Sequence, residues 1–216
     1  VFIALLGLAI GFAAGIELFE FLLKNDYFID DSAADLLAMA GEVAKTFEEA
    51  GHVRYSTLVA LHAAIASASA GDWSSGVLWA ERAADLARRL GLRSFELRAR
   101  AWMALHFART GNVDIALATA MAAVRDSTGN RVAEGEAHVH LAHIHLASRD
   151  MDAAYEAAGH VWKDPSFSAD ARGRAGGILA QLLLLRDRVD EALEMANESL
   201  GVLEHVRPLG DSEVRV

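Results

Sequence analysis

The stretch TGNVDIALATAMAAV, residues 110–124, shows how this chain folds. Gly111 and Asn112 form a turn signal, because glycine accepts left-handed backbone angles and asparagine favours turns. Ala116, Ala120 and Ala123 then recur at spacings of four and three residues, which places them on one side of a helix. The stretch therefore predicts a helix that begins after a turn and packs closely against a neighbour through alanine.

The same pattern recurs along the chain, beginning with AGDWSSGVLWAERAA at residues 70–84. Four segments share a polar turn, a large apolar residue, a small residue three positions later and another small residue four positions after that. The small residues are Gly76 and Ala80, Ala116 and Ala120, Ala154 and Ala158, and Ala192 and Ala196, so that the first of each pair follows its predecessor by 40, 38 and 38 residues. A repeat of this period predicts a stacked array, because small side chains let helix axes approach closely.

Each of these segments is preceded by another apolar stretch of similar length, at residues 56–69, 97–110, 135–148 and 171–185. Most of these stretches are rich in alanine, leucine, glutamate and arginine, which favour helix over strand. AHVHLAHIHL (137–146) alternates as a strand would, but its position in the repeat predicts a helix. Glycines twenty residues apart predict the helix ends, because glycine is common where a helix stops; they are Gly51, Gly71, Gly91 and Gly111.

The composition excludes several classes of protein. The 216 residues are 53% hydrophobic with a mean hydropathy of +0.22, which is too apolar for a disordered chain. Two prolines and no cysteine fit a helical protein without disulfides or thiolate metal sites. A net charge of −10 disfavours nucleic-acid binding, because phosphate backbones repel an acidic surface.

The two-helix unit, with its Gly-Asp turn and its small residues, resembles the tetratricopeptide repeat over roughly residues 32–216. Its 38–40 residues exceed the usual length of about 34, and only Pro165 and Pro208 could serve as the closing proline. Phrases such as LGLRSFELRARAWMALHFARTGN (90–112) are similar to the long repeats of bacterial multidomain signalling proteins, among them serine/threonine kinases with C-terminal arrays and MalT-like ATPase regulators.

The predicted fold is all-α, a right-handed α-solenoid of about five helix-turn-helix units. The expected units are 1–50, 51–90, 91–130, 131–168 and 169–206, and a sixth unit begins at the C-terminus, where the array is truncated.

Residues 1–23 form an apolar segment that differs in composition from the repeat array at residues 24–216. Residues 1–16 carry no charge, and Gly7, Gly11 and Gly15 form a spacing that lets membrane helices pack closely. The stretch is therefore a membrane anchor or the first helix of the array, in which case residues 28–51 are its partner helix. No basic segment precedes the apolar run, which argues against a signal peptide. We expect a cytoplasmic protein, with attachment to a membrane through residues 1–23 as the alternative.

The resemblance also implies a binding site, because the first helix of each tetratricopeptide unit lines a concave groove that binds partners. An arginine beside a tryptophan suits an acidic peptide or a C-terminal carboxylate. The lysine and asparagine carboxylate clamp of chaperone-binding arrays is absent. The matching positions are His62, Arg98, Trp102, Arg109, Glu136, His140, His143, Arg174 and Gln181, together with the apolar Ile65, Leu105 and Ile178.

The predicted function is therefore a non-catalytic protein-interaction module that binds a peptide or a partner domain, as the regulatory or scaffold part of a bacterial signalling protein. The alternative is a membrane-tethered assembly factor anchored by residues 1–23. No phosphate-binding loop, nucleophile elbow, zinc-protease helix or kinase signature occurs. Gly173, Gly176 and Gly177 are predicted to lie inside a helix, where small residues permit close packing.

Four histidines lie within eight residues, at His138, His140, His143 and His145. At about 100° per residue, His140 and His143 share one side of a helix with Glu136, and this trio could hold Zn²⁺ or Ni²⁺. His138 and His145 fall where the repeat carries aromatic core residues. We predict that these two pack in the core, that the other two line the groove, and that no metal or cofactor is bound. The alternatives are an enzyme that acts through this helix and pH-sensitive binding.

Overall fold

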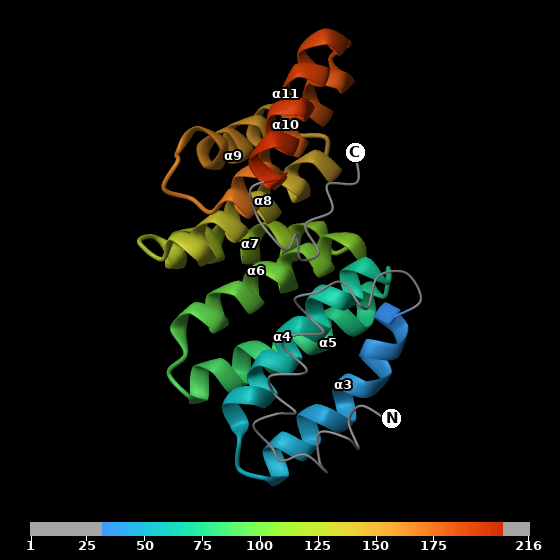
Figure 1. Cartoon of the computed structure of the whole chain (residues 1–216), viewed down its shortest axis with the longest axis vertical. Helices are drawn as coiled ribbons and strands as arrows, with labels where there is room; N and C mark the ends of the chain where they lie inside the picture. Colours follow the sequence, from blue (N-terminus) through green and yellow to red (C-terminus); the bar gives the residue numbers. More distant parts are fainter. Residues whose placement is uncertain (1–31, 205–216) are drawn as a thin grey trace.

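The computed structural model describes residues 32–204 of the chain. Over this range the fold consists of nine α-helices joined by short turns, without a strand (Figure 1). The predicted right-handed α-solenoid is confirmed. The helices are α3 (Ser32–Glu49), α4 (Val53–Ser69), α5 (Trp73–Arg89), α6 (Arg93–Arg109), α7 (Val113–Ser127), α8 (Arg131–Ala147), α9 (Met151–Lys163), α10 (Ala169–Leu185) and α11 (Val189–Glu204).

Consecutive helices pair as the units α4–α5, α6–α7, α8–α9 and α10–α11, which follow one another along the long axis of the molecule (Figure 1). The second helix of a unit also packs against the first helix of the next. The first helices contact one another in turn, α4 on α6, α6 on α8 and α8 on α10. We call this row of first helices the inner row. It brings side chains from three different units together, which a single unit cannot do.

α3 packs on α4 in the way that the second helix of a preceding unit would. The predicted apolar helix at residues 1–23 lies outside the described residues, as does the start of the sixth unit. Both the membrane anchor and the buried first helix therefore stay predictions. Between residues 32 and 204, no helix combines the length and the apolar character that crossing a bilayer requires.

Seven of the eight turns between α3 and α11 end a helix with one left-handed residue, the exception being the connection from α9 to α10. The predicted glycines Gly51, Gly71, Gly91 and Gly111 all have a positive φ, between 67° and 87°. The amide of the residue after the glycine then donates a hydrogen bond to the carbonyl oxygen five residues before it. An example is the bond from Asp72 N to Ser67 O at 2.9 Å. Two later turns keep this geometry without glycine, at Arg149 with φ 63° and at Asp187 with φ 60°.

Arg149→Gly is expected to raise the free energy of unfolding by about 1 kcal/mol, because a side chain in the left-handed region is strained by about that much. Arg149 is exposed, so little packing is lost with its side chain. Urea unfolding followed by circular dichroism measures the change. The reciprocal variant Gly111→Ala should lose a similar amount. An Arg149→Gly protein that is less stable than the parent would contradict this account of the turn.

Alanine dominates the core, as the repeat pattern predicted. Ala80, Ala116, Ala120, Ala154 and Ala158 are all fully or almost fully buried. Larger side chains fill the space between these close contacts, and the largest cluster joins α8, α9 and α10. Close approach of helix axes through alanine is therefore what lets each unit bury its apolar face against its neighbours.

The glycines of α10 show the same close approach. A Cβ added at Gly173 would lie closer than 3.0 Å to the Leu203 side chain, and one at Gly176 would lie 2.9 Å from Ser199 Cβ. The Ser199 hydroxyl donates a hydrogen bond of 2.6 Å to the Gly173 carbonyl oxygen. These glycines lie inside the helix, as predicted, and they let α11 rest directly on the backbone of α10.

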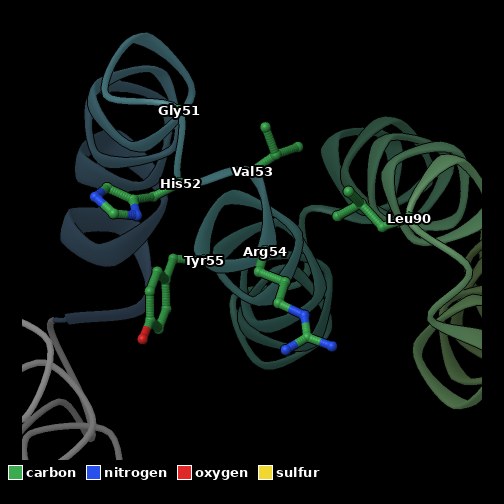
Figure 2. A pocket seen from close by; sticks show the side chains of 6 residues that line it. All are labelled: Gly51, His52, Val53, Arg54, Tyr55 and Leu90. Atoms are coloured by element: carbon green, nitrogen blue, oxygen red, sulfur yellow. The ribbon is translucent and has the colours of Figure 1, made fainter.

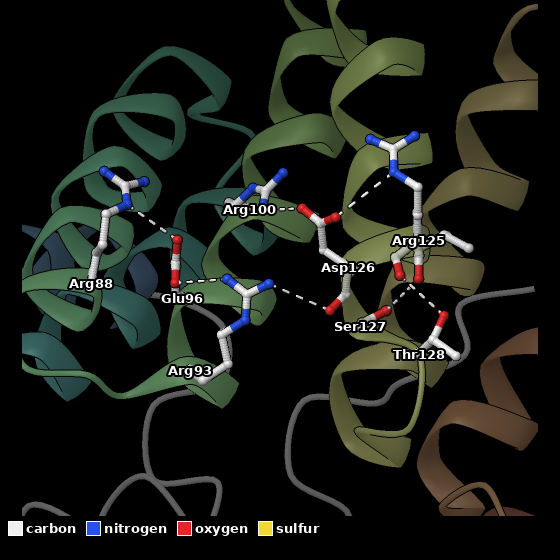
Figure 3. A network of polar contacts seen from close by, with 9 residues as sticks. Arg88, Arg93, Glu96, Arg100, Arg125, Asp126, Ser127 and Thr128 are labelled. Carbon is white, nitrogen blue, oxygen red and sulfur yellow. Dashed lines mark hydrogen bonds and ion pairs between the residues drawn. The ribbon is translucent and has the colours of Figure 1, made fainter.

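A network of charged side chains connects the unit α4–α5 to the unit α6–α7 (Figure 3). Glu96 at the start of α6 accepts hydrogen bonds from Arg88 at 3.1 Å and from Arg93 at 3.0 Å. Asp126 at the end of α7 accepts one from Arg100 at 2.7 Å. This network joins α5, α6 and α7, and it engages these charged side chains in contacts within the chain.

Candidate functional site

The middle of the inner row gathers most of the predicted groove residues. Trp102 on α6 meets His140 on α8 edge to face, with ring centroids 4.3 Å apart. The guanidinium of Arg174 on α10 lies 5.5 Å from the centre of the Trp102 ring. Side chains from the first helices of three units thus converge on one cluster. We call Arg98, Trp102, Arg109, Glu136, His140, His143 and Arg174 the inner cluster.

An ion pair spans the inner cluster. Arg98 on α6 donates two hydrogen bonds to the Glu136 carboxylate on α8, at 2.9 Å from Nε and 2.8 Å from Nη2. The Glu136 side chain is 11% exposed, and that of Arg98 is 25% exposed. Arg174 lies 3.9 Å from an oxygen of Asp170 on its own helix. Both oxygens of Glu136 are engaged with Arg98.

Two histidines of the inner cluster stay neutral at ordinary pH. Burial lowers the pKa of His143 to about 3, and the guanidinium groups of Arg174 and Arg109 act in the same sense. Burial, then the charges of Arg174, His143, His106 and Arg98, hold the pKa of His140 well below its usual value. Neighbouring arginines favour the neutral ring because they repel a second positive charge. The cluster is therefore rich in arginine, and its two imidazoles are uncharged.

The inner cluster contains buried polar atoms without partners among the described residues. The Trp102 indole N–H and both ring nitrogens of His140 lack a hydrogen bond. His140 is fully buried, and Trp102 is 8% exposed. Buried polar groups are normally satisfied, and an unmade hydrogen bond costs about 1–3 kcal/mol. These atoms can donate or accept bonds if a bound segment or a small shift of the rings brings a partner to them.

The nine predicted residues differ in how far they reach the surface. Arg109 and Gln181 are exposed, whereas Trp102, Glu136 and His140 are buried. The others, His62, Arg98, His143 and Arg174, are half-buried. His62 belongs to α4 and Gln181 to the last turns of α10, so these two lie toward the ends of the inner row. The arginines and His143 therefore reach solvent, while Trp102, Glu136 and His140 lie beneath them.

A second histidine group lies on α8 and α9. The rings of His138 and His160 pack at a tilt of 39° with their centroids 4.4 Å apart, and Glu134 lies close to both. The repeat pattern predicted His138 in the core and did not single out His160 or Glu134. The available signal was the four-residue spacing from Glu134 to His138, which puts both on one face of a helix. The partner from α9 becomes visible only when the two helices are packed.

A shallow pocket of about 330 Å³ lies at the turn between α3 and α4 (Figure 2). It is lined by Gly51, His52, Val53, Arg54, Tyr55 and Leu90. None of the predicted groove residues lines it. We take the inner cluster as the candidate site, because side chains from three units converge there.

No protein-family model matches the chain, and no curated protein matches it. Solved structures do. BtubC (BKLC) from P. vanneervenii superposes with a TM-score of 0.52 at 11% identity, over 83% of this chain and 84% of that chain. A variant of the nearly identical TPR-like repeats from a candidate kinesin light chain of Podosopora anserina superposes with a TM-score of 0.50 at 15% identity, over 78% of this chain and 95% of that chain.

At these identities the likeness concerns the fold. It agrees with the pairing of helices, the period of 38–40 residues and the buried alanines described above. Within residues 32–204 the chain is a right-handed α-solenoid of tetratricopeptide-like repeats.

Proposed function

We propose that this chain is a non-catalytic protein-interaction module that binds an acidic or carboxylate-bearing segment of a partner on the inner cluster. The observation that carries the proposal is the gathering of Arg98, Arg109 and Arg174 around His143 and His140, in a protein whose net charge is −10. Arginine presents a rigid fork of donors that matches a carboxylate.

The charges of the inner cluster are not fully balanced. Glu136 neutralises Arg98, and Asp170 lies 3.9 Å from Arg174. No carboxylate lies within 4.0 Å of Arg109 in the described part of the chain, and its guanidinium rests 5.3 Å from the centre of the Trp73 ring. Arg109 is therefore an exposed cation held over an aromatic surface. Such a group can bind a carboxylate without first losing an internal ion pair.

The remaining predicted residues have supporting roles in this proposal. Trp102 and His140 form a buried floor, and Glu136 holds the Arg98 guanidinium in a fixed orientation. His62 and Gln181 lie on the same row of helices to either side and extend the contact surface along the partner. The role as a regulatory or scaffold part of a bacterial signalling protein rests on the long-repeat resemblance alone.

Arg109→Ala is expected to weaken the binding of an acidic peptide several-fold, because an exposed pair of opposite charges contributes up to about 1 kcal/mol. The probe is fluorescein-labelled hexaglutamate, followed by fluorescence anisotropy at low and at physiological salt. Arg174→Ala should have a similar effect. Arg89→Ala is the matched control, because Arg89 is an exposed arginine at the end of α5, away from the inner row.

Hexaglutamine, which has no side-chain charge, tests whether the inner cluster recognises the peptide by its negative charge. The proposal predicts that it binds at least tenfold more weakly than hexaglutamate, and that added salt removes most of the difference. Equal binding of the two peptides would contradict the proposal. So would an equal loss of hexaglutamate binding in Arg89→Ala and Arg109→Ala, because that result indicates attraction to the whole surface.

A further inference from the structure

Three potential metal ligands converge between α8 and α9. They are Glu134 and His138, one helical turn apart on α8, and His160 in the last turn of α9. One ligand atom from each residue lies within 4.8 Å of the others. This group is distinct from the inner cluster and from the trio that the sequence suggested, because it lies between two helices of a single unit.

The surroundings hold these side chains in place. The imidazoles of His138 and His160 contact each other at a tilt, with centroids 4.4 Å apart, and the Phe167 ring packs edge-on against His160 at 5.6 Å. Glu134 is buried, His138 is half-buried and His160 is exposed. The group therefore has a buried floor and one open side, which is where an ion and its remaining water ligands would enter.

The two side chains of α8 have atoms that are free to bind an ion. The buried Nδ1 of His138 has no hydrogen-bond partner among the described residues. Glu134 contacts the Gly129 amide at 3.2 Å and Arg131 at 3.6 Å, both through Oε2. Its Oε1 is thus left for a ligand.

We propose that Glu134, His138 and His160 bind a divalent transition-metal ion of the zinc class. Two imidazoles and one carboxylate are donors that Zn²⁺, Ni²⁺, Co²⁺ and Cu²⁺ accept, whereas Mg²⁺ and Ca²⁺ require more oxygen ligands. Ligand atoms around tetrahedral Zn²⁺ lie about 3.4 Å apart, so the group has to close by at most about 1.4 Å. A small rotation of the exposed His160 side chain is enough for this movement.

Arg131 is the competitor for this carboxylate. Its guanidinium lies 3.6 Å from Glu134, 3.4 Å from Asp164 and 4.8 Å from the centre of the Phe167 ring. The Asp164 carboxylate and the Phe167 ring can keep the arginine when Glu134 turns toward an ion. A bound ion would connect α8 to α9 across the unit and would therefore stabilise the fold, because it binds the folded state preferentially.

The test uses the chain without a polyhistidine tag, stripped with EDTA. Isothermal titration with ZnCl₂ should give one site per chain in the micromolar range, and Zn²⁺ should raise the melting temperature by several degrees. Mg²⁺ should do neither. Co²⁺ in place of Zn²⁺ should produce visible absorption bands, which report ligation directly. His160→Ala should weaken Zn²⁺ binding at least tenfold, and Glu134→Gln should do the same.

Two histidine variants serve as controls. His145→Ala removes a half-buried histidine of α8 that lies outside the group, and His143→Ala disrupts the trio that the sequence suggested. Both should bind Zn²⁺ as the parent does. His160 is exposed, so His160→Ala should keep the parent helicity by circular dichroism. The proposal is overturned if no saturable site appears, if His160→Ala binds as well as the parent, or if His143→Ala abolishes binding.

Discussion

Gly76→Ala is expected to lower the free energy of unfolding by about 3 kcal/mol, although a single methyl group in a helix normally stabilises it. A Cβ at position 76 would lie closer than 3.0 Å to three atoms of the His106 ring. The ring is flat and stiff, so it cannot bend away as the end of a long side chain could. The clash has to be relieved by moving the ring or the helix.

The surroundings of His106 prevent the ring from moving. His106 is fully buried, and its Nε2 lies 3.0 Å from the Ala64 carbonyl oxygen on α4. Trp73 and Trp102 pack beside it, with ring centroids at 5.9 Å and 6.3 Å. A displaced ring loses its hydrogen bond and disturbs both indoles. The expected cost combines overpacking, about 1–3 kcal/mol, with a buried hydrogen bond of about 1 kcal/mol.

Urea unfolding followed by circular dichroism measures the loss. Gly159→Ala is the matched control, because an added Cβ there meets nothing within 4 Å. It should be neutral or stabilising by up to about 1 kcal/mol. In a His106→Ala background the penalty of Gly76→Ala should largely disappear, since the clashing ring is gone. A loss below about 1 kcal/mol in the parent background would falsify the clash.

Acidification between pH 7 and pH 5 is expected to destabilise the protein by about 4 kcal/mol through His138 and His143 together. The pKa of His138 is lowered to about 4 and that of His143 to about 3, mainly because both rings are withdrawn from water. His140, whose pKa is also well below its usual value, acts in the same direction. A typical domain has about 5–15 kcal/mol of stability in total, so the effect is large.

The sign follows from where the protons bind. A histidine in the unfolded chain has a pKa of about 6.5. As the pH falls through this value, the unfolded chain takes up protons that the folded chain does not, and the free energy of unfolding decreases. The loss continues down to the folded-state pKa values of about 4 and about 3. Each of the two rings contributes about 2 kcal/mol between pH 7 and pH 5.

Charged neighbours determine the size of this effect at each ring. His143 faces Arg109 on α6 and Arg174 on α10, whereas His138 faces Glu134 on its own helix and His160 on α9. His143→Gln should therefore reduce the loss of stability between pH 7 and pH 5 by about 2 kcal/mol. His52→Gln, at an exposed histidine outside both clusters, should leave it unchanged. Stability that does not change over this range would show that the rings are protonated in the folded state.

The fold could be predicted from the sequence because the repeat is a local pattern. Glycines such as Gly71 and Gly111 end helices through their own backbone freedom, and small residues such as Ala116 and Ala154 mark close contacts wherever they recur. Neither signal depends on distant parts of the chain. The Arg149 and Asp187 turns could be recognised only from their place in the repeat, because the left-handed geometry is kept there without glycine.

The reason for glycine at position 76 depends on the neighbouring unit. Positions 116 and 154 are equivalent to it and carry alanine, and they pack in clusters with Ile144 and Leu182. The residue at the matching place in α6 is His106, whose rigid ring leaves no room for a Cβ. The sequence predicts a small residue at this position, but only the packed helices show why it has to be the smallest.

In the candidate site, too, the sequence determined some features and the tertiary structure decided others. The period of the repeat determined by itself that Arg98, Trp102, His140 and Arg174 belong to the first helices, since helical spacing is a local property. Tertiary structure decided that Arg174 reaches Trp102 from two units away, that His140 is fully buried, and that His138 meets His160. Those contacts depend on how successive units stack in space. The stacking results from many weak packing preferences added over the whole array, so no short segment of the sequence determines it.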